Sequence, residues 1–343
     1  MKQVRLGRSE LLVTKTAMGC LPIQRCSEED VVAILRHAYE GGIRYFDTAN
    51  GYTDSEHKMG IALSVYPRES YVISTKSMGK DAGTVLAHIE NSLRELKTDY
   101  IDLFQFHMVG EMPDFDDPNG MYAGALEAKR RGWIRHIGVT AHKLELAFDL
   151  VRTGKFETMQ FPFSYISGER ERELIELCRE LDVGFICMKG LSGGLITNAR
   201  ACHAFMRQYD SIVPIWGIQT MDQLNEWLAL AEEDPALDEE LTAVIEHDRK
   251  ELAGSFCRGC GYCAPCPADI EIRNSARMNM LLRRSPWQPL LSPEEYEKMH
   301  RIENCIGCRQ CTTRCPYGLD IPELLKFMLK DYDEFYEAHK DQL

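Results

Sequence analysis

The stretch YVISTKSMGKDAGTVLAHIENSLRELKTDYIDLFQFH, residues 71–107, decides the fold because it holds one complete unit of an alternating pattern. Its two ends, residues 71–76 and 100–107, are short runs rich in β-branched and aromatic residues, which predict strands. Between them, the periodicity of residues 81–97 predicts a helix. A strand followed by a helix and then by another strand is the repeating unit of an α/β fold.

The same unit recurs through the first 230 residues. Ser27 is expected to cap the first helix, with Asp30 at the capping-box position. Eight strand-then-helix units predict a (β/α)₈ TIM barrel rather than an open doubly wound sheet. No GxGxxG sequence follows the first strand, which argues against a dinucleotide-binding Rossmann domain. The remaining strands are expected at residues 15–19, 43–47, 134–140, 157–163, 183–189 and 212–217.

Eight of the 13 cysteines lie in two short runs near the end of the chain. The second run has the spacing C-x₂-C-x₂-C-x₃-C-P, which is typical of a bacterial [4Fe–4S] ferredoxin. The first run is one residue shorter before its last cysteine. Zinc is the alternative metal, but structural zinc sites separate two close cysteine pairs by a longer loop, so two tight quartets favour iron. The eight candidate ligands are Cys257, Cys260, Cys263, Cys266, Cys305, Cys308, Cys311 and Cys315.

The two cysteine runs form an internal repeat that resembles the two-cluster bacterial ferredoxins. The resemblance implies two [4Fe–4S] clusters with crossed ligands. In that arrangement Cys315 completes the site of the first three cysteines, and Cys266 completes the site of Cys305, Cys308 and Cys311. Two alternatives stay open: each run holds its own cluster, or only one cluster is present.

Four polar residues fall at the carboxyl ends of consecutive expected strands, where TIM barrels carry their chemistry. They are Asp47, Tyr52, Lys76 and His107. A tyrosine is too weak an acid at neutral pH to donate its proton efficiently, but a neighbouring ammonium lowers its pKa. Asp47 would keep Lys76 charged, and His107 would orient a substrate carbonyl. With a hydride from a nicotinamide, this set would convert a carbonyl to an alcohol.

These residues and the segments GGIRYFDTANGY, YVISTK and YIDLFQFH resemble the aldo/keto reductase superfamily. Asp47, Tyr52, Lys76 and His107 match its catalytic tetrad one by one. The resemblance covers residues 1–230, and the whole chain is similar to a branch that carries a carboxyl-terminal iron–sulfur domain. We therefore expect a barrel over residues 1–230. A helical connector and a smaller, mostly helical ferredoxin-like domain should follow over residues 231–343.

The positions that hold the nicotinamide cofactor in this family match less closely. Family members have a serine–asparagine pair after the fifth strand. In this sequence Thr140 supplies the hydroxyl of that pair, and the asparagine is missing. Gln160 matches the family glutamine on the sixth strand, whereas Met188 stands where a tyrosine stacks on the nicotinamide. The other residues expected at the cofactor are Ser192, Gly193, Gly194, Gly217, Gln219, Thr220 and Gln223.

The loop of residues 192–194 is expected to cradle a phosphate through backbone N–H groups, although its composition also suits a flexible loop. Gln219 stands where family members place a basic residue for the 2′-phosphate of NADP, so the sequence offers no preference for NADP over NAD. Met188 leaves room for a flavin, and the alternative function is a flavin- or cluster-dependent electron-transfer protein.

Composition limits the partners. The net charge of −13 argues against nucleic acid, and no apolar run approaches the length of a membrane span. The first residues do not form a secretory signal, so a cytoplasmic enzyme is expected. The expected partners are a small carbonyl or alcohol substrate and a redox partner protein.

Overall fold

The computed structural model describes residues 1–342 except 253–255, 260, 285–286 and 316. The chain divides into two compact units. The first comprises Met1–Gly190 and Ala199–Thr242, and the second comprises Leu191–Asn198 and Ala243–Leu343. The sequence placed the boundary at residue 230. In the structure the division falls within helix α9 (Glu239–Glu251), and an eight-residue segment from the middle of the chain groups with the second unit.

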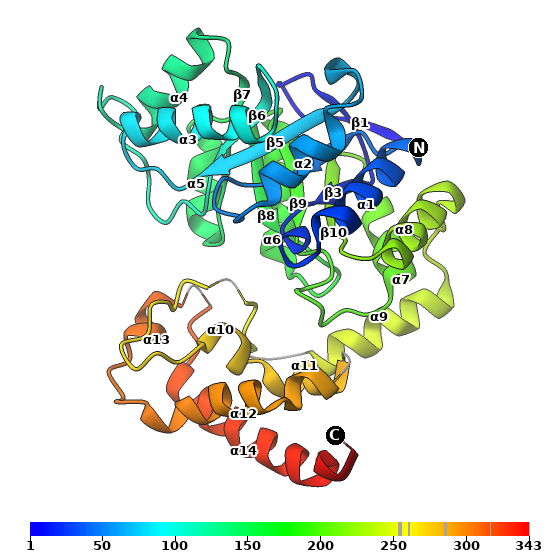
Figure 1. The fold of residues 1–343 in the computed structure, drawn as a ribbon, viewed down its shortest axis with the longest axis vertical. Coiled ribbons are helices and arrows are strands. Elements are labelled where there is room, and N and C mark those ends of the chain that lie inside the picture. Colours follow the sequence, from blue (N-terminus) through cyan, green and yellow to red (C-terminus); the bar gives the residue numbers. More distant parts are fainter. Residues whose placement is uncertain (253–255, 260, 285–286, 316, 343) are drawn as a thin grey trace. The chain divides into compact units, whose positions relative to one another are not determined.

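The first unit is a closed barrel of eight parallel strands in the order β10-β3-β4-β5-β6-β7-β8-β9, which confirms the predicted fold class. Figure 1 shows these strands surrounded by helices. The barrel strands are β3 (Ala17–Gly19), β4 (Tyr45–Asp47), β5 (Val72–Ser77), β6 (Ile101–Phe106), β7 (Ile134–Thr140), β8 (Thr158–Pro162), β9 (Gly184–Met188) and β10 (Ile212–Gly217).

Each barrel strand is followed by a helix whose apolar face is buried. The predicted cap of the first helix is confirmed, because the Ser27 side chain accepts a hydrogen bond from the Asp30 N–H at 3.1 Å. Asp81 caps α3 in the same way through Thr84. The helices are α1 (Glu28–Glu40), α2 (Ser55–Leu63), α3 (Ala82–Glu95), α4 (Met121–Arg130), α5 (Leu144–Arg152), α6 (Glu169–Glu180), α7 (Ala199–Arg207) and α8 (Met221–Glu233).

A short antiparallel hairpin of β1 (Gln3–Arg5) and β2 (Leu12–Thr14) precedes the barrel and was not predicted. Val4 and Val13 of this hairpin pack in one buried cluster with the barrel residues Leu103, Ile186 and Val213. The hairpin turn also pairs with the chain just before β9, through Gly7 and Val183. The hairpin therefore covers the end of the barrel at which the strands begin.

The second unit is mostly helical and has a hydrophobic core of its own. Cys257 and Cys263 belong to that core, together with Leu325, Met328 and Tyr332 of its longest helix. Helices α12 (Pro293–His300) and α14 (Ile321–His339) pack against each other, as Figure 1 shows. Its shorter helices are α10 (Ile272–Ser275), α11 (Met278–Arg284) and α13 (Gln310–Arg314). Within the described ranges, every helix is too short or too polar to cross a lipid bilayer.

Candidate functional site

A buried ion pair joins the carboxyl ends of β4 and β5. The Lys76 ammonium donates to Asp47 Oδ2 at 2.6 Å and to the Thr48 carbonyl at 2.5 Å. Ser74 donates to the other carboxylate oxygen of Asp47 at 2.5 Å. Burial by itself lowers the pKa of Lys76, but attraction to Asp47 and to Tyr52 outweighs it and leaves this pKa above its ordinary value. Lys76 is therefore a fixed positive charge at the end of the barrel.

Tyr52 and His107 complete the group around this charge. Tyr52 lies in the loop between β4 and α2, and the Lys76 ammonium is 5.3 Å from the centre of its ring. His107 follows β6 directly, and its ring centre is 5.5 Å from that of Tyr52 at an angle of 78°. The structure thus brings the four residues expected to be catalytic together at one end of the barrel.

His107 is held in its neutral form. Burial, and then the charge of Lys76, lowers its pKa to about 3. Its Nδ1 is buried and has no hydrogen-bond partner among the described residues. A neutral imidazole can donate an N–H to a substrate oxygen without carrying a second positive charge beside Lys76.

Gln105 is a site residue that the sequence reasoning missed. It lies on β6 inside the barrel, and its amide nitrogen donates to Gln160 Oε1 at 2.8 Å and to Asp47 Oδ1 at 3.3 Å. Gly138 makes room for it, since a methyl group there would lie 3.2 Å from Gln105 Cγ and 2.1 Å from Thr158 Oγ1. The available signal was one glutamine inside the otherwise apolar run LFQF, residues 103–106.

The residues expected at the nicotinamide lie at the same ends of the strands. Thr140 pairs with Gln160 across β7 and β8, and its hydroxyl accepts from the Met108 N–H at 2.7 Å. Met188 ends β9, and Gly217 ends β10. Because parallel strands share one edge at their carboxyl ends, these positions and the ion pair face the same end of the barrel.

The other cofactor candidates after β10 form the start of α8. Thr220 accepts a hydrogen bond from the Gln223 N–H at 3.2 Å, and the Gln223 side chain accepts from the Gln219 N–H at 3.0 Å. Two of these side chains therefore cap the helix. None of the three carries a charge.

The candidate phosphate loop groups with the second unit. Ser192, Gly193 and Gly194 have φ angles of +50°, +69° and +93°, so the backbone is left-handed over three consecutive residues. The Gly194 N–H donates to the Leu191 carbonyl at 2.9 Å, so it closes a turn within the loop. The phosphate cradle stays a prediction from the sequence.

Five cysteines line one pocket of the second unit. Cys305, Cys308 and Cys311 come from the second cysteine run, whereas Cys263 and Cys266 come from the first. Ile270, Ile272 and Leu325 complete much of its apolar wall. The pocket thus gathers the first three cysteines of the second run with the last two of the first, and the crossed arrangement assigns Cys266 but not Cys263 to this site. A set of thiolates alone is the donor set that iron–sulfur clusters use.

The remaining candidate ligands are partly described. Cys257 is buried, and its sulfur accepts a hydrogen bond from the Gly259 N–H at 3.4 Å. Cys315 packs against the same core. Cys260 lies outside the described residues. Among the residues that the structure describes, no three His, Cys, Asp or Glu side chains are placed to hold a single metal ion.

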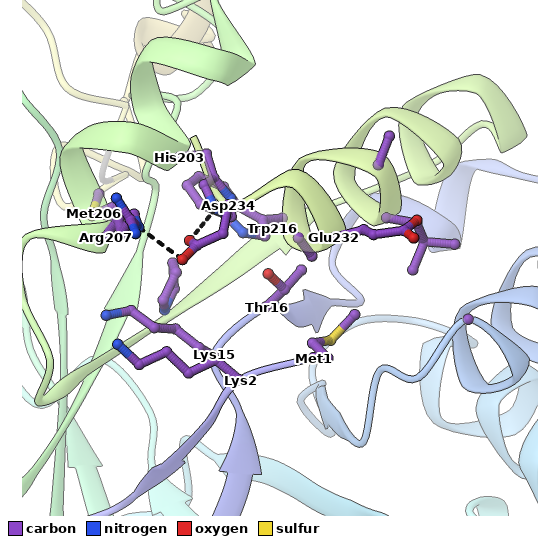
Figure 2. A pocket seen from close by; sticks show the side chains of 15 residues that line it. Met1, Lys2, Lys15, Thr16, His203, Met206, Arg207, Trp216, Glu232 and Asp234 are labelled. Atoms are coloured by element: carbon purple, nitrogen blue, oxygen red, sulfur yellow. Dashed lines mark hydrogen bonds and ion pairs between the residues drawn. The ribbon is translucent and has the colours of Figure 1, made fainter. Parts of the chain in front are cut away.

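A second pocket lies at the opposite end of the barrel, where the strands begin. Lys15 precedes β3, Arg207 is the last residue of α7, and His203 lies one turn earlier in the same helix. Figure 2 shows Arg207 and His203 directed toward Asp234, at 2.8 and 3.3 Å. Because TIM barrels place their chemistry at the carboxyl ends of the strands, this pocket is separate from the candidate active site.

Comparison with known proteins gives a family for each region. Residues 16–210 match the aldo/keto reductase family, and residues 256–320 match a 4Fe-4S dicluster domain. The chain is 26% identical over 269 residues to the NADH-specific methylglyoxal reductase of Escherichia coli, a match that covers 67% of this chain and 81% of that protein.

Two other relatives match a smaller part of the chain. The chain is 29% identical over 245 residues to the aldo-keto reductase AFTS1 of Alternaria alternata, which covers 57% of this chain and 66% of that protein. A match to the probable aldo-keto reductase 1 of Glycine max covers 60% of that protein. The chain thus spans less than two thirds of the length of these two relatives.

Solved structures show the same barrel. An aldo-keto reductase from Bacillus halodurans in its holo form aligns with a TM-score of 0.61 and 23% identity, covering 72% of this chain and 96% of that one. The aldo-keto reductase of Klebsiella pneumoniae in complex with NADPH aligns with a TM-score of 0.60 and 21% identity, covering 72% and 94%. At these identities the likeness shows the fold. Because the family match covers more than half of the sequence, we conclude that the chain belongs to the aldo/keto reductase family.

Proposed function

We propose that the barrel interconverts a small carbonyl compound and its alcohol, with a nicotinamide cofactor as the hydride carrier. The observation that carries this proposal is the convergence of Tyr52, the charged Lys76 and the neutral His107 at one end of the barrel. Each of these groups has a task in protonating a carbonyl oxygen.

Tyr52 is the proposed proton donor. An ordinary tyrosine has a pKa near 10, so it needs a neighbour that stabilises the phenolate left behind. Lys76 supplies that positive charge, and its hydrogen bond to Asp47 holds it in place. His107 would donate an N–H to the carbonyl oxygen and thereby hold it beside the Tyr52 hydroxyl.

The barrel residues fit a nicotinamide. When bound, that cofactor supplies the hydride. The Oε1 atom of Gln160 accepts from Gln105, which leaves the Gln160 amide nitrogen as the group that can donate to a carboxamide oxygen. Gln105 Oε1 is itself buried without a hydrogen-bond partner among the described residues. Gln105 is therefore a positioning residue that sets the orientation of Gln160.

For the second unit, we propose two [4Fe–4S] clusters that pass electrons one at a time. The pocket of five cysteines supports crossed ligation, because Cys266 of the first run lies there with three cysteines of the second. A hydride moves two electrons together, whereas each cluster carries one, so exchange between the two systems calls for an intermediate carrier such as a flavin.

The first prediction concerns the proton donor. Tyr52→Phe should lower the kcat/KM for carbonyl reduction by about 10²- to 10⁴-fold, because the donated proton is lost, while nucleotide affinity stays the same. Steady-state rates with a set of small aldehydes that includes methylglyoxal, together with a nucleotide titration, test this. Tyr66→Phe is the matched control, since the Tyr66 hydroxyl is bonded to Glu40 on the surface. Near-normal turnover by Tyr52→Phe would remove Tyr52 from the proposed role.

The second prediction concerns Gln105. Gln105→Met keeps the side-chain volume but removes the hydrogen bonds to Gln160 and Asp47, so nucleotide affinity should fall by about tenfold. The kcat at saturating nucleotide should change by less than about threefold, because Asp47 keeps Ser74 and Lys76. Gln208→Met is the control, as the Gln208 amide donates to the Phe205 carbonyl at the end of its own helix. A loss of kcat without a loss of affinity would contradict the positioning of Gln160.

The third prediction concerns the clusters. The anaerobically purified protein should contain about eight irons and eight acid-labile sulfides. Cys266→Ser should halve both numbers, because it removes one ligand from the five-cysteine pocket. Cys26→Ser in the barrel is the control and should leave both numbers unchanged. Stoichiometric zinc without sulfide would exclude iron–sulfur clusters. Four irons in the unaltered protein would mean that it holds one cluster instead of two. An additional flavin band in the absorbance spectrum would favour the flavin-dependent alternative.

The fourth prediction concerns the nucleotide. NAD(H) should bind at least as tightly as NADP(H), because Gln219 and Gln223 offer no positive charge to a 2′-phosphate and are hydrogen-bonded to each other. Titration of both nucleotides by protein fluorescence measures the ratio of the two dissociation constants. A clear preference for NADPH would contradict this prediction.

A further inference from the structure

The cavity at the end of the barrel where the strands begin has a volume of about 720 Å³ and lies entirely within the first unit (Figure 2). Its walls come from the segment before β3, from β10 and from helices α7 and α8. Met206, Pro214, Leu228 and the ring of Trp216 give it an apolar part. Pockets that bind small organic molecules have volumes of roughly 300–1,000 Å³, so this cavity is large enough for such a ligand.

Lys15 is a buried amine in the wall of this cavity. The residue is 9% exposed, and its Nζ donates to the Tyr209 carbonyl at 2.5 Å. Burial, and then the positive charge of Lys2, lowers the pKa of Lys15 to about 8. The direction of this shift means that the surroundings do not fully compensate the charge of the ammonium group.

The nearest carboxylates are paired with other cations. Asp210 is paired with Lys2 at 2.9 Å. Asp234 is paired with Arg207 at 2.8 Å. Lys15 forms no ion pair with any residue that the structure describes, and its printed hydrogen bond goes to a carbonyl. One positive charge in the wall is therefore left without a counter-ion.

Two further polar groups line the cavity. Glu232 is exposed, and Figure 2 shows its carboxylate directed away from the Lys15 ammonium. The indole Nε1 of Trp216 is buried and has no acceptor among the described residues. A buried donor without an acceptor is unfavourable. Lys15 and Trp216 are thus two donors for which a bound molecule can supply the acceptor.

We propose that this cavity binds a small monocarboxylate, whose carboxylate pairs with Lys15 and whose apolar body packs against Met206 and Leu228. A carboxylate carries one negative charge, which matches the one uncompensated charge. A phosphate monoester carries nearly two at neutral pH, and Asp210 and Asp234, whose charges act on Lys15, would repel the second. The cavity is separate from the proposed active site, so this ligand is distinct from the carbonyl substrate.

The first arm of the test measures binding by calorimetry on the full-length protein. Benzoate and hexanoate should bind, whereas benzyl alcohol and phenyl phosphate should bind about tenfold more weakly than benzoate. Lys15→Met keeps the apolar stem but removes the charge, so benzoate should also bind it about tenfold more weakly. Lys129→Met is the matched control, since Lys129 is paired with Glu157 on the surface. The circular dichroism spectrum of each variant checks that it is folded.

The second arm varies the pH and uses the unaltered protein, so it does not depend on the folding of Lys15→Met. Only the protonated amine pairs with a carboxylate, so affinity should fall as the pH rises through the pKa of Lys15, about 8. From one pH unit below that value to one above it, the dissociation constant of benzoate should rise about tenfold. Lys15→Arg should bind benzoate without this rise, because a guanidinium stays charged.

Other groups around Lys15 could also titrate. Burial lowers the pKa of His203, so this side chain is already neutral in the pH range of the test. A pH dependence that persists in Lys15→Arg would come from a different group and would overturn the role of Lys15. The remaining titratable or charged residues there are Met1, Lys2, Arg207, Asp210, Glu232 and Asp234.

The other outcomes are equally decisive. If neither benzoate nor hexanoate binds, or if benzoate binds Lys15→Met as tightly as the unaltered protein, the proposal fails. Equal binding of benzyl alcohol would show a purely apolar pocket, and tighter binding of phenyl phosphate would exclude the carboxylate as the preferred group. None of these results depends on the carbonyl chemistry of the barrel.

Discussion

The buried pair of Asp47 and Lys76 is the interaction on which the active end of the barrel depends. Two opposite charges can be buried away from water only where they form an ion pair and their remaining hydrogen-bonding groups have partners. Here the carboxylate receives Lys76 on one oxygen and Ser74 on the other, and the ammonium also donates to a backbone carbonyl. Removing one member of such a pair typically costs about 3–5 kcal/mol, because the other charge remains buried. The pair lies where β4 and β5 are in register, with Asp47 opposite Ser74, and Tyr52 lies in the loop that follows β4.

The same pair orders the polar groups around it. Burial, and then the charge of Lys76, lowers the pKa of His107 and keeps it neutral. The carboxylate of the pair is one of two acceptors of the Gln105 amide. Gln105 in turn reaches Gln160 on β8. A line of hydrogen bonds thus crosses the barrel interior from the acid–base residues to the position expected to hold the carboxamide. The same hydrogen bonds therefore position both the Asp47 carboxylate and the Gln160 amide.

The local features of the fold could be predicted from the sequence because they depend on residues close in the chain. The alternation of strands and helices, the Ser27 cap and the strand-end positions of Asp47, Lys76 and His107 are of this kind. The contact of Gln105 with Gln160 depends on residues 55 positions apart meeting inside a closed barrel, which no local pattern contains. The packing of Arg277 against Gly193 spans 84 positions and escaped prediction for the same reason. For the cysteines, spacing left several ligand pairings open, because it does not say which sulfur atoms of the two runs meet in the folded chain.

The membership of residues 191–198 in the second unit means that the two units are not consecutive along the chain. This segment joins β9 to α7, so a part of the second unit lies within the sequence of the first. A ferredoxin-like domain taken from the carboxyl-terminal part alone would lack that segment, whose Gly193 accepts a hydrogen bond from Arg277. Exchanging the carboxyl-terminal part between homologues should accordingly succeed best when residues 191–198 are exchanged with it.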